Sequence, residues 1–65
     1  MQGFELRTIE EEKDLSISIS KLFNFLKTET FKIMGMTEGI LLIEQLAAMR
    51  EYSRILNKRI ERFGK

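Results

Sequence analysis

Apolar residues recur at alternating three- and four-residue steps through the second half of the chain. The repeat is carried by Leu42, Leu46, Met49, Leu56, Ile60 and Phe63, with Gly39 and Ser53 at the remaining two positions. This spacing is typical of a helix that lies along another helix, because it keeps one apolar stripe facing the partner. The pattern predicts a helix over residues 37–63.

A second stripe with the same spacing precedes it. Its members are Leu15, Ile19, Leu22, Leu26 and Ile33, widened by Phe23, with Glu12 and Glu29 as its polar positions. Thr8 and Glu11 have the spacing of a capping box, which marks the start of a helix. We therefore expect the first helix to span residues 8–34.

The two predicted helices are separated by a very short connection. Gly35 is typical of a helix C-cap, and Thr37 is a favoured N-cap residue. Residues 35–36 are therefore expected to form the turn. A connection this short places consecutive helices antiparallel. The sequence thus predicts an all-α fold whose basic unit is a two-helix hairpin.

The N-terminal third also carries a competing strand pattern. Phe4 and Leu6 alternate with charged residues, and residues 15–20 alternate apolar residues with serine. Such alternation is typical of strands. Residues 1–7 are accordingly expected to be a flexible arm or a short strand. A hairpin between the two segments is less favoured than a helix, because residues 10–14 lack the Gly and Asn of tight hairpin turns.

The start of the second predicted helix is apolar nearly all round. Only Glu44 and Gln45 interrupt a run that contains Ile40, Leu41, Leu42, Ile43, Leu46, Ala47, Ala48 and Met49. A helix that is apolar on most sides is buried on most sides, which one partner helix cannot achieve. A chain of 65 residues without Cys or His also lacks disulfides and the usual zinc ligands. We therefore expect two hairpins to dimerise into a four-helix bundle of coiled-coil type.

These features predict a small non-enzymatic protein-interaction or oligomerisation module, such as a regulator, an adaptor or an assembly factor. It would act as a homo-dimer or higher homo-oligomer, or through a protein partner. The residues expected to form its interface are Ile40, Leu42, Ile43, Leu46, Met49, Leu56, Ile60 and Phe63.

Charge is distributed unevenly along the chain and suggests an alternative function. Residues 1–14 carry five acids and two bases, whereas residues 50–65 carry six bases and two acids. A basic ridge is formed by Arg50, Arg54, Lys58, Arg59 and Arg62. Such a ridge could contact phosphates in a dimeric nucleic-acid-binding regulator, including one of ribbon-helix-helix type. In an antiparallel hairpin, however, the acidic start of the chain lies near the ridge and offsets it.

Other classes of function have little support in the sequence. No nucleophile–base pair, phosphate-binding glycine loop or metal-ligand motif is present, so no enzyme activity and no cofactor are expected. The most apolar window, residues 40–49, is shorter than the roughly 20 residues that a membrane-spanning helix needs. We expect a cytoplasmic protein.

Overall fold

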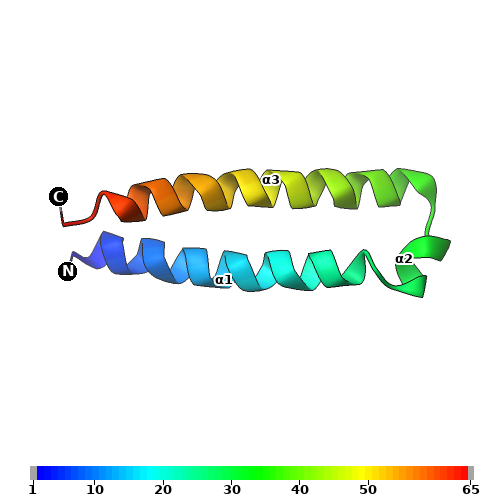
Figure 1. Cartoon of the computed structure of the whole chain (residues 1–65), viewed down its shortest axis with the longest axis horizontal. Coiled ribbons are helices and arrows are strands. Elements are labelled where there is room, and N and C mark those ends of the chain that lie inside the picture. The colour runs from blue at the N-terminus through cyan, green and yellow to red at the C-terminus, as the bar shows by residue number, and fades with distance from the viewer. Residues whose placement is uncertain (1, 65) are drawn as a thin grey trace.

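The chain forms an antiparallel helical hairpin. A computed structural model describes residues 2–64, in which α1 spans Gly3–Phe25, α2 spans Glu29–Ile33 and α3 spans Met36–Glu61. The two long helices α1 and α3 lie side by side, with both chain ends together and α2 at the opposite end (Figure 1). No strand occurs between residues 2 and 64. The predicted all-α hairpin is confirmed, and its dimerisation stays a prediction.

The core is the single seam where α1 meets α3. Leu56 is completely buried, and Leu46 retains 6% of its exposure. Half-buried residues continue the seam on both helices, namely Leu15, Ile19, Leu22 and Leu26 on α1 and Leu42, Met49, Ile60 and Phe63 on α3. These are the predicted three- and four-residue positions. The repeat therefore located the buried stripe of each long helix. It was wrong at its end, because Glu29 and Ile33 lie in α2 and are exposed, Ile33 at 83%.

The first helix begins before the predicted capping box. Gln2 is the N-cap of α1, and its backbone N–H donates to the Glu5 carboxylate over 2.8 Å. The expectation of an arm or strand over residues 1–7 is therefore wrong for the described residues 2–7. Thr8 is buried inside α1, where its hydroxyl donates to the carbonyl of Phe4 over 2.8 Å. A threonine that bonds back to the preceding turn is compatible with a helix interior.

Contact between the chain ends explains why the first turn of α1 is helical. The rings of Phe4 and Phe63 meet edge to face, with centroids 6.1 Å apart. Edge-to-face aromatic pairs stabilise beyond the apolar area that they bury. The alternation of Phe4 and Leu6 resembled a strand, but tertiary contact with the end of α3 favours the helix.

The first helix also ends earlier than predicted, at Phe25 instead of residue 34. The break follows from Thr28, whose hydroxyl donates to the Phe25 carbonyl over 2.7 Å and accepts the Phe31 N–H over 3.2 Å. The hydroxyl thus closes α1 and caps α2 at the same time. Threonine hydroxyls often compete with helix hydrogen bonds in this way.

The short helix α2 covers the end of the seam. Phe31 packs edge to face on Phe25 at 6.4 Å, and its ring also lies against Gly39. Gly35 is the N-cap of α3 with an ordinary φ of −61°, and Thr37 lies inside the helix. The predicted roles of Gly35 as C-cap and Thr37 as N-cap are therefore wrong. Gly64, with φ of +82°, follows α3 as expected for a residue that closes a helix.

Replacing Gly39 with alanine is expected to stabilise the hairpin by about 0.5–1 kcal/mol, because glycine inside a helix is less favourable than alanine. An added Cβ would lie 3.6 Å from Cε1 of Phe31, an ordinary van der Waals contact. Thermal unfolding followed by circular dichroism should show a higher midpoint. Gly64→Ala is the matched control, since its positive φ makes alanine unfavourable by about 1 kcal/mol. A lower unfolding midpoint for Gly39→Ala would show that the space beside Phe31 does not accept the added Cβ.

Candidate interaction surface

The eight predicted interface residues divide into two groups. Six of them lie in the seam that faces α1, namely Leu42, Leu46, Met49, Leu56, Ile60 and Phe63. Ile40 and Ile43 lie outside it and keep 51% and 53% of their exposure. The six residues hold the hairpin together, so a partner that binds the folded hairpin meets Ile40 and Ile43 first.

A polar pair crosses the seam near its middle. The Ser53 hydroxyl lies 3.0 Å and 3.2 Å from the two carboxylate oxygens of Glu12. Ser16 donates to the same carboxylate over 2.6 Å. Both Glu12 and Ser53 interrupt the apolar stripes of their own helices, and the fold brings them together. Polar seam residues that recognise each other specify which turns of two helices align.

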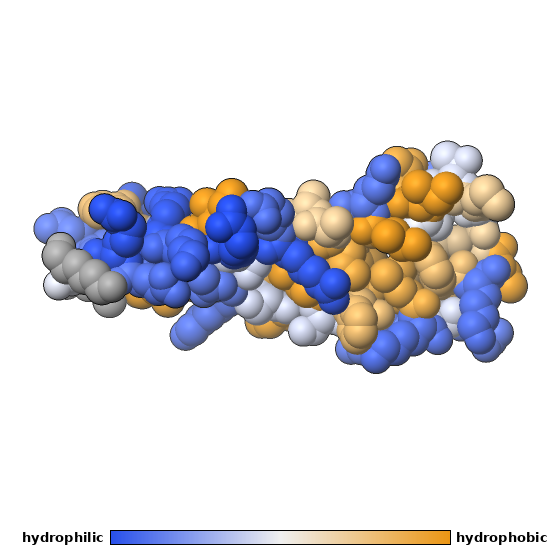
Figure 2. Space-filling model, turned by 45° about the horizontal axis from the view of Figure 1, so that its top comes forward, coloured by the Kyte–Doolittle hydropathy of each residue, from blue (hydrophilic) through white to orange (hydrophobic). Residues whose placement is uncertain are grey.

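Apolar side chains are left exposed mainly at the end of the hairpin that holds α2. Ile33 and Met36 keep 83% and 81% of their exposure. Figure 2 shows apolar surface over the half that contains α2 and the start of α3, and polar surface over the other half. We call the exposed group there the turn-end patch, and its members are Phe23, Ile33, Met36, Ile40 and Ile43.

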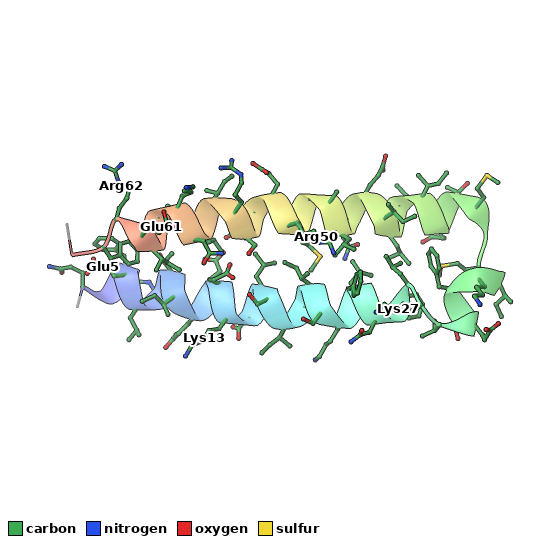
Figure 3. All side chains as sticks on the ribbon, viewed as in Figure 1. Glu5, Lys13, Lys27, Arg50, Glu61 and Arg62 are labelled. Carbon is green, nitrogen blue, oxygen red and sulfur yellow. The ribbon has the colours of Figure 1, made fainter. Side chains whose placement is uncertain are left out.

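Two cations border the turn-end patch. The Lys27 ammonium lies 4.3 Å from the ring centroid of Phe23, and the Arg50 guanidinium lies 5.6 Å from it. Cations at these distances are attracted to the ring face. They come from α3 and from the segment after α1, and Figure 3 shows where each side chain lies. The patch therefore has an apolar centre and a basic border.

The basic ridge is exposed along the second half of α3, but its members are engaged differently. Arg54 and Glu51 form an ion pair of 2.6 Å, and Lys58 pairs with Glu61 at 3.7 Å. The side-chain hydrogen bond from Arg54 lowers the pKa of Glu51 and raises the pKa of Arg54 itself. Arg59 donates to the Thr8 hydroxyl over 3.4 Å. Arg62 occupies the C-cap position of α3, where its backbone N–H donates to the carbonyls of Arg59 and Ile60.

The acidic start of the chain lies close to the basic ridge, as expected, but it forms no ion pair with the ridge among the described residues. The first turns of α1 do lie beside the last turns of α3 (Figure 1). Within residues 2–64, however, every ion pair joins two residues of one helix. The polar contacts that cross between the described helices in this region are hydrogen bonds between a charged side chain and an uncharged hydroxyl: Arg59 donates to Thr8, and Glu12 accepts from Ser53.

Pockets, metal-ligand groups and helices able to span a membrane are absent from the part of the chain that the structure describes. No cavity and no group of three or more potential metal ligands occurs among those residues. None of the described helices is both long and apolar enough to cross a membrane.

The fold and its surface define a class: a small antiparallel helical hairpin with a minimal seam and a large exposed apolar patch. A family model described as Sequestin matches residues 2–62, and the chain belongs to the Sequestin family. No curated protein matches the chain, and no solved structure does. Family membership is consistent with a small protein-binding role and gives no support to the nucleic-acid alternative.

Proposed function

We propose that this chain is a non-enzymatic protein-interaction module that binds its partner through the turn-end patch. The observation that carries the proposal is the concentration of large exposed apolar side chains at one end of the hairpin. Contiguous apolar patches on a small protein typically mark an interaction surface. Membership in the Sequestin family supports a role in binding protein.

The geometry of the patch suggests the chemistry of the partner. Ile40 and Ile43 belong to one side of α3, and Phe23 of α1 lies beside Arg50 on the same side. An amphipathic helix can lie along such a surface and insert its apolar stripe. Lys27 and Arg50 at the border favour acidic residues next to that stripe. The proposed partner is therefore a helix with an apolar stripe and an acidic flank.

Self-association forms the second part of the proposal. Among the described apolar residues, only Leu46 and Leu56 are buried, which is a small core for 65 residues. Chains of this size commonly gain stability from oligomerisation when they lack disulfides and metals. A homo-oligomer would also bring several turn-end patches into one particle, which raises the avidity for a multivalent partner.

Photo-crosslinking tests partner binding with a closely matched pair of sites. Ile43 and Ile17 are both isoleucines, 53% and 54% exposed, but Ile17 lies on α1 away from the patch. The full chain, with a photoreactive residue at position 43, is expressed in the organism that it comes from. It should then form discrete crosslinked adducts with another polypeptide. The same residue at position 17 should give few.

The expected adducts should depend on the rest of the patch. Adding Ile40→Asp should reduce the yield from position 43 at least tenfold, whereas adding Lys13→Asp on the outer face of α1 should not. Circular dichroism would establish that each variant remains helical. Equal labelling from positions 43 and 17, or a yield that Ile40→Asp leaves unchanged, would refute binding through the patch.

A further inference from the structure

Helix α3 carries a second repeat of three- and four-residue steps beside its seam. It consists of Glu38, Leu41, Gln45, Ala48, Tyr52, Ile55 and Arg59, and we call it the outer stripe. All seven residues are exposed. Each lies one position before a seam residue, which rotates the outer stripe by about 100° from the face that meets α1. Helices in a four-helix bundle contact two neighbours through faces about this far apart.

The outer stripe is complementary to itself when two copies run antiparallel. Ala48 is its central member, and Leu41 and Ile55 lie seven residues to either side. Across a two-fold axis at Ala48, Leu41 of one copy therefore meets Ile55 of the other. Gln45 lies three residues before Ala48 and Tyr52 four residues after it, so these two side chains are offset by one residue across the axis. The two Ala48 residues face each other. The small side chain at the centre permits the helices to approach closely.

Charge favours the same orientation. The first half of α3 carries Glu38 and Glu44 and no base, whereas its second half carries four bases against two acids. Antiparallel pairing brings unlike halves together, and parallel pairing would bring like halves together. At the two ends of the outer stripe, Glu38 lies ten residues before Ala48 and Arg59 eleven residues after it, so Glu38 of one copy lies within one residue of Arg59 of the other. Such complementarity selects orientation and partner.

The chain exposes more surface than a compact protein of its size. The chain exposes 5106 Å². A compact folded protein of 7.7 kDa exposes about 4,300 Å² by the usual size relation. This excess reflects the elongated shape of a two-helix hairpin. By the same relation, a compact dimer of twice the mass would expose about 7,200 Å², so each copy could bury up to about 1,500 Å². That is more than the roughly 800 Å² per partner of a standard protein–protein interface, so the chain has enough free surface for a second copy.

We infer that two copies pair antiparallel through the outer stripes of α3, with Ala48 on the two-fold axis. This inference rests on the self-association that forms part of the proposed function, and it specifies the face, orientation and register. Ile43 lies five residues from Ala48, which places it about 140° away around α3. The turn-end patch therefore stays accessible in the dimer.

Cysteine pairing tests the register directly, because the chain has no cysteine of its own. Ala48→Cys should form an intermolecular disulfide nearly completely on mild oxidation, since Cβ atoms must lie about 3.5–4.5 Å apart. Ala47→Cys is the matched control, because it is an exposed alanine turned by about 100°. Ala47→Cys should form at least tenfold less intermolecular disulfide than Ala48→Cys. Equal crosslinking at the two positions would overturn the register.

Charge reversal provides a second test that does not depend on oxidation. Light scattering of the purified chain should give twice the monomer mass. Glu38→Arg should weaken the dimer about tenfold, and adding Arg59→Glu should restore it. Arg50→Glu added instead should not restore it, because Arg50 lies two residues from the axis and far from Glu38 of the other copy. Failure of the rescue would overturn the antiparallel pairing, even if the variants are folded.

The two proposals fail in different ways. A monomeric mass for the purified chain at millimolar concentration would overturn the dimer, while adducts from position 43 with another polypeptide would still support partner binding. A dimer with the Ala48 disulfide but no such adducts would support the pairing and refute the partner site.

Discussion

Replacing Leu56 with alanine is expected to lower the free energy of unfolding by about 2–5 kcal/mol. Leu56 is the only described residue with a completely buried large side chain. Its truncation removes apolar contacts and leaves a cavity in a seam that is one side chain wide. A chain of this size has a total stability of only about 3–10 kcal/mol. The variant should therefore be largely unfolded or close to it.

Ile17→Ala is the control for this substitution. Ile17 is 54% exposed on α1 and stands outside the seam, the turn-end patch and the outer stripe. Its truncation should change stability by no more than about 0.5 kcal/mol. Urea unfolding followed by circular dichroism measures both variants. Similar losses for the two would show that Leu56 is not the centre of the core.

Replacing both Glu12 and Ser53 with leucine is expected to stabilise the hairpin by about 1–2 kcal/mol, because both are half-buried polar residues in an otherwise apolar seam. The two positions face each other across the seam, where Ser53 donates to the Glu12 carboxylate over 3.0 Å. Leucine at both would make the apolar seam continuous. Thermal and urea unfolding of the double variant provide the measurement.

The single variant should behave in the opposite way. Ser53→Ala removes one hydroxyl from a half-buried carboxylate that keeps its hydrogen bond from Ser16, and it should cost about 0.5–1.5 kcal/mol. The double variant is also expected to lose specificity, because the polar pair aligns the two helices. Light scattering should then detect species larger than those of the wild type. A double variant less stable than the wild type would mean that the pair contributes more than an apolar contact could.

The seam was predictable in detail because its cause is local. A helix turns by about 100° per residue, so the positions that face a neighbouring helix follow from spacing alone. Leu46 and Leu56, identified by that spacing, are the two buried apolar residues of the described chain. The same reasoning flagged Glu12 and Ser53 as polar interruptions. It could not show that the two meet, since that depends on how α1 and α3 align.

Helix ends were predicted less well because they depend on competition between hydrogen bonds and on tertiary contacts. Thr8 has the sequence spacing of a helix start, yet the contact of Phe4 with Phe63 extends α1 beyond it. The sequence pattern did not mark Thr28 as a helix end, although its hydroxyl ends one helix and begins another. Threonine can serve either within a helix or at its end, and only its partners decide between them.

By itself, the sequence determined the all-α class and the buried face of each long helix, because helical periodicity requires them. It also predicted the antiparallel hairpin, although residues 26–35 and not residues 35–36 connect α1 to α3. It also indicated excess apolar surface on the start of the second helix. Only the tertiary structure decided how that surface is divided. The seam with α1 takes Leu42, Leu46 and Met49, while Ile40 and Ile43 stay exposed. The physical reason is that one neighbouring helix covers one stripe, and packing against it fixes which apolar residues remain for a partner.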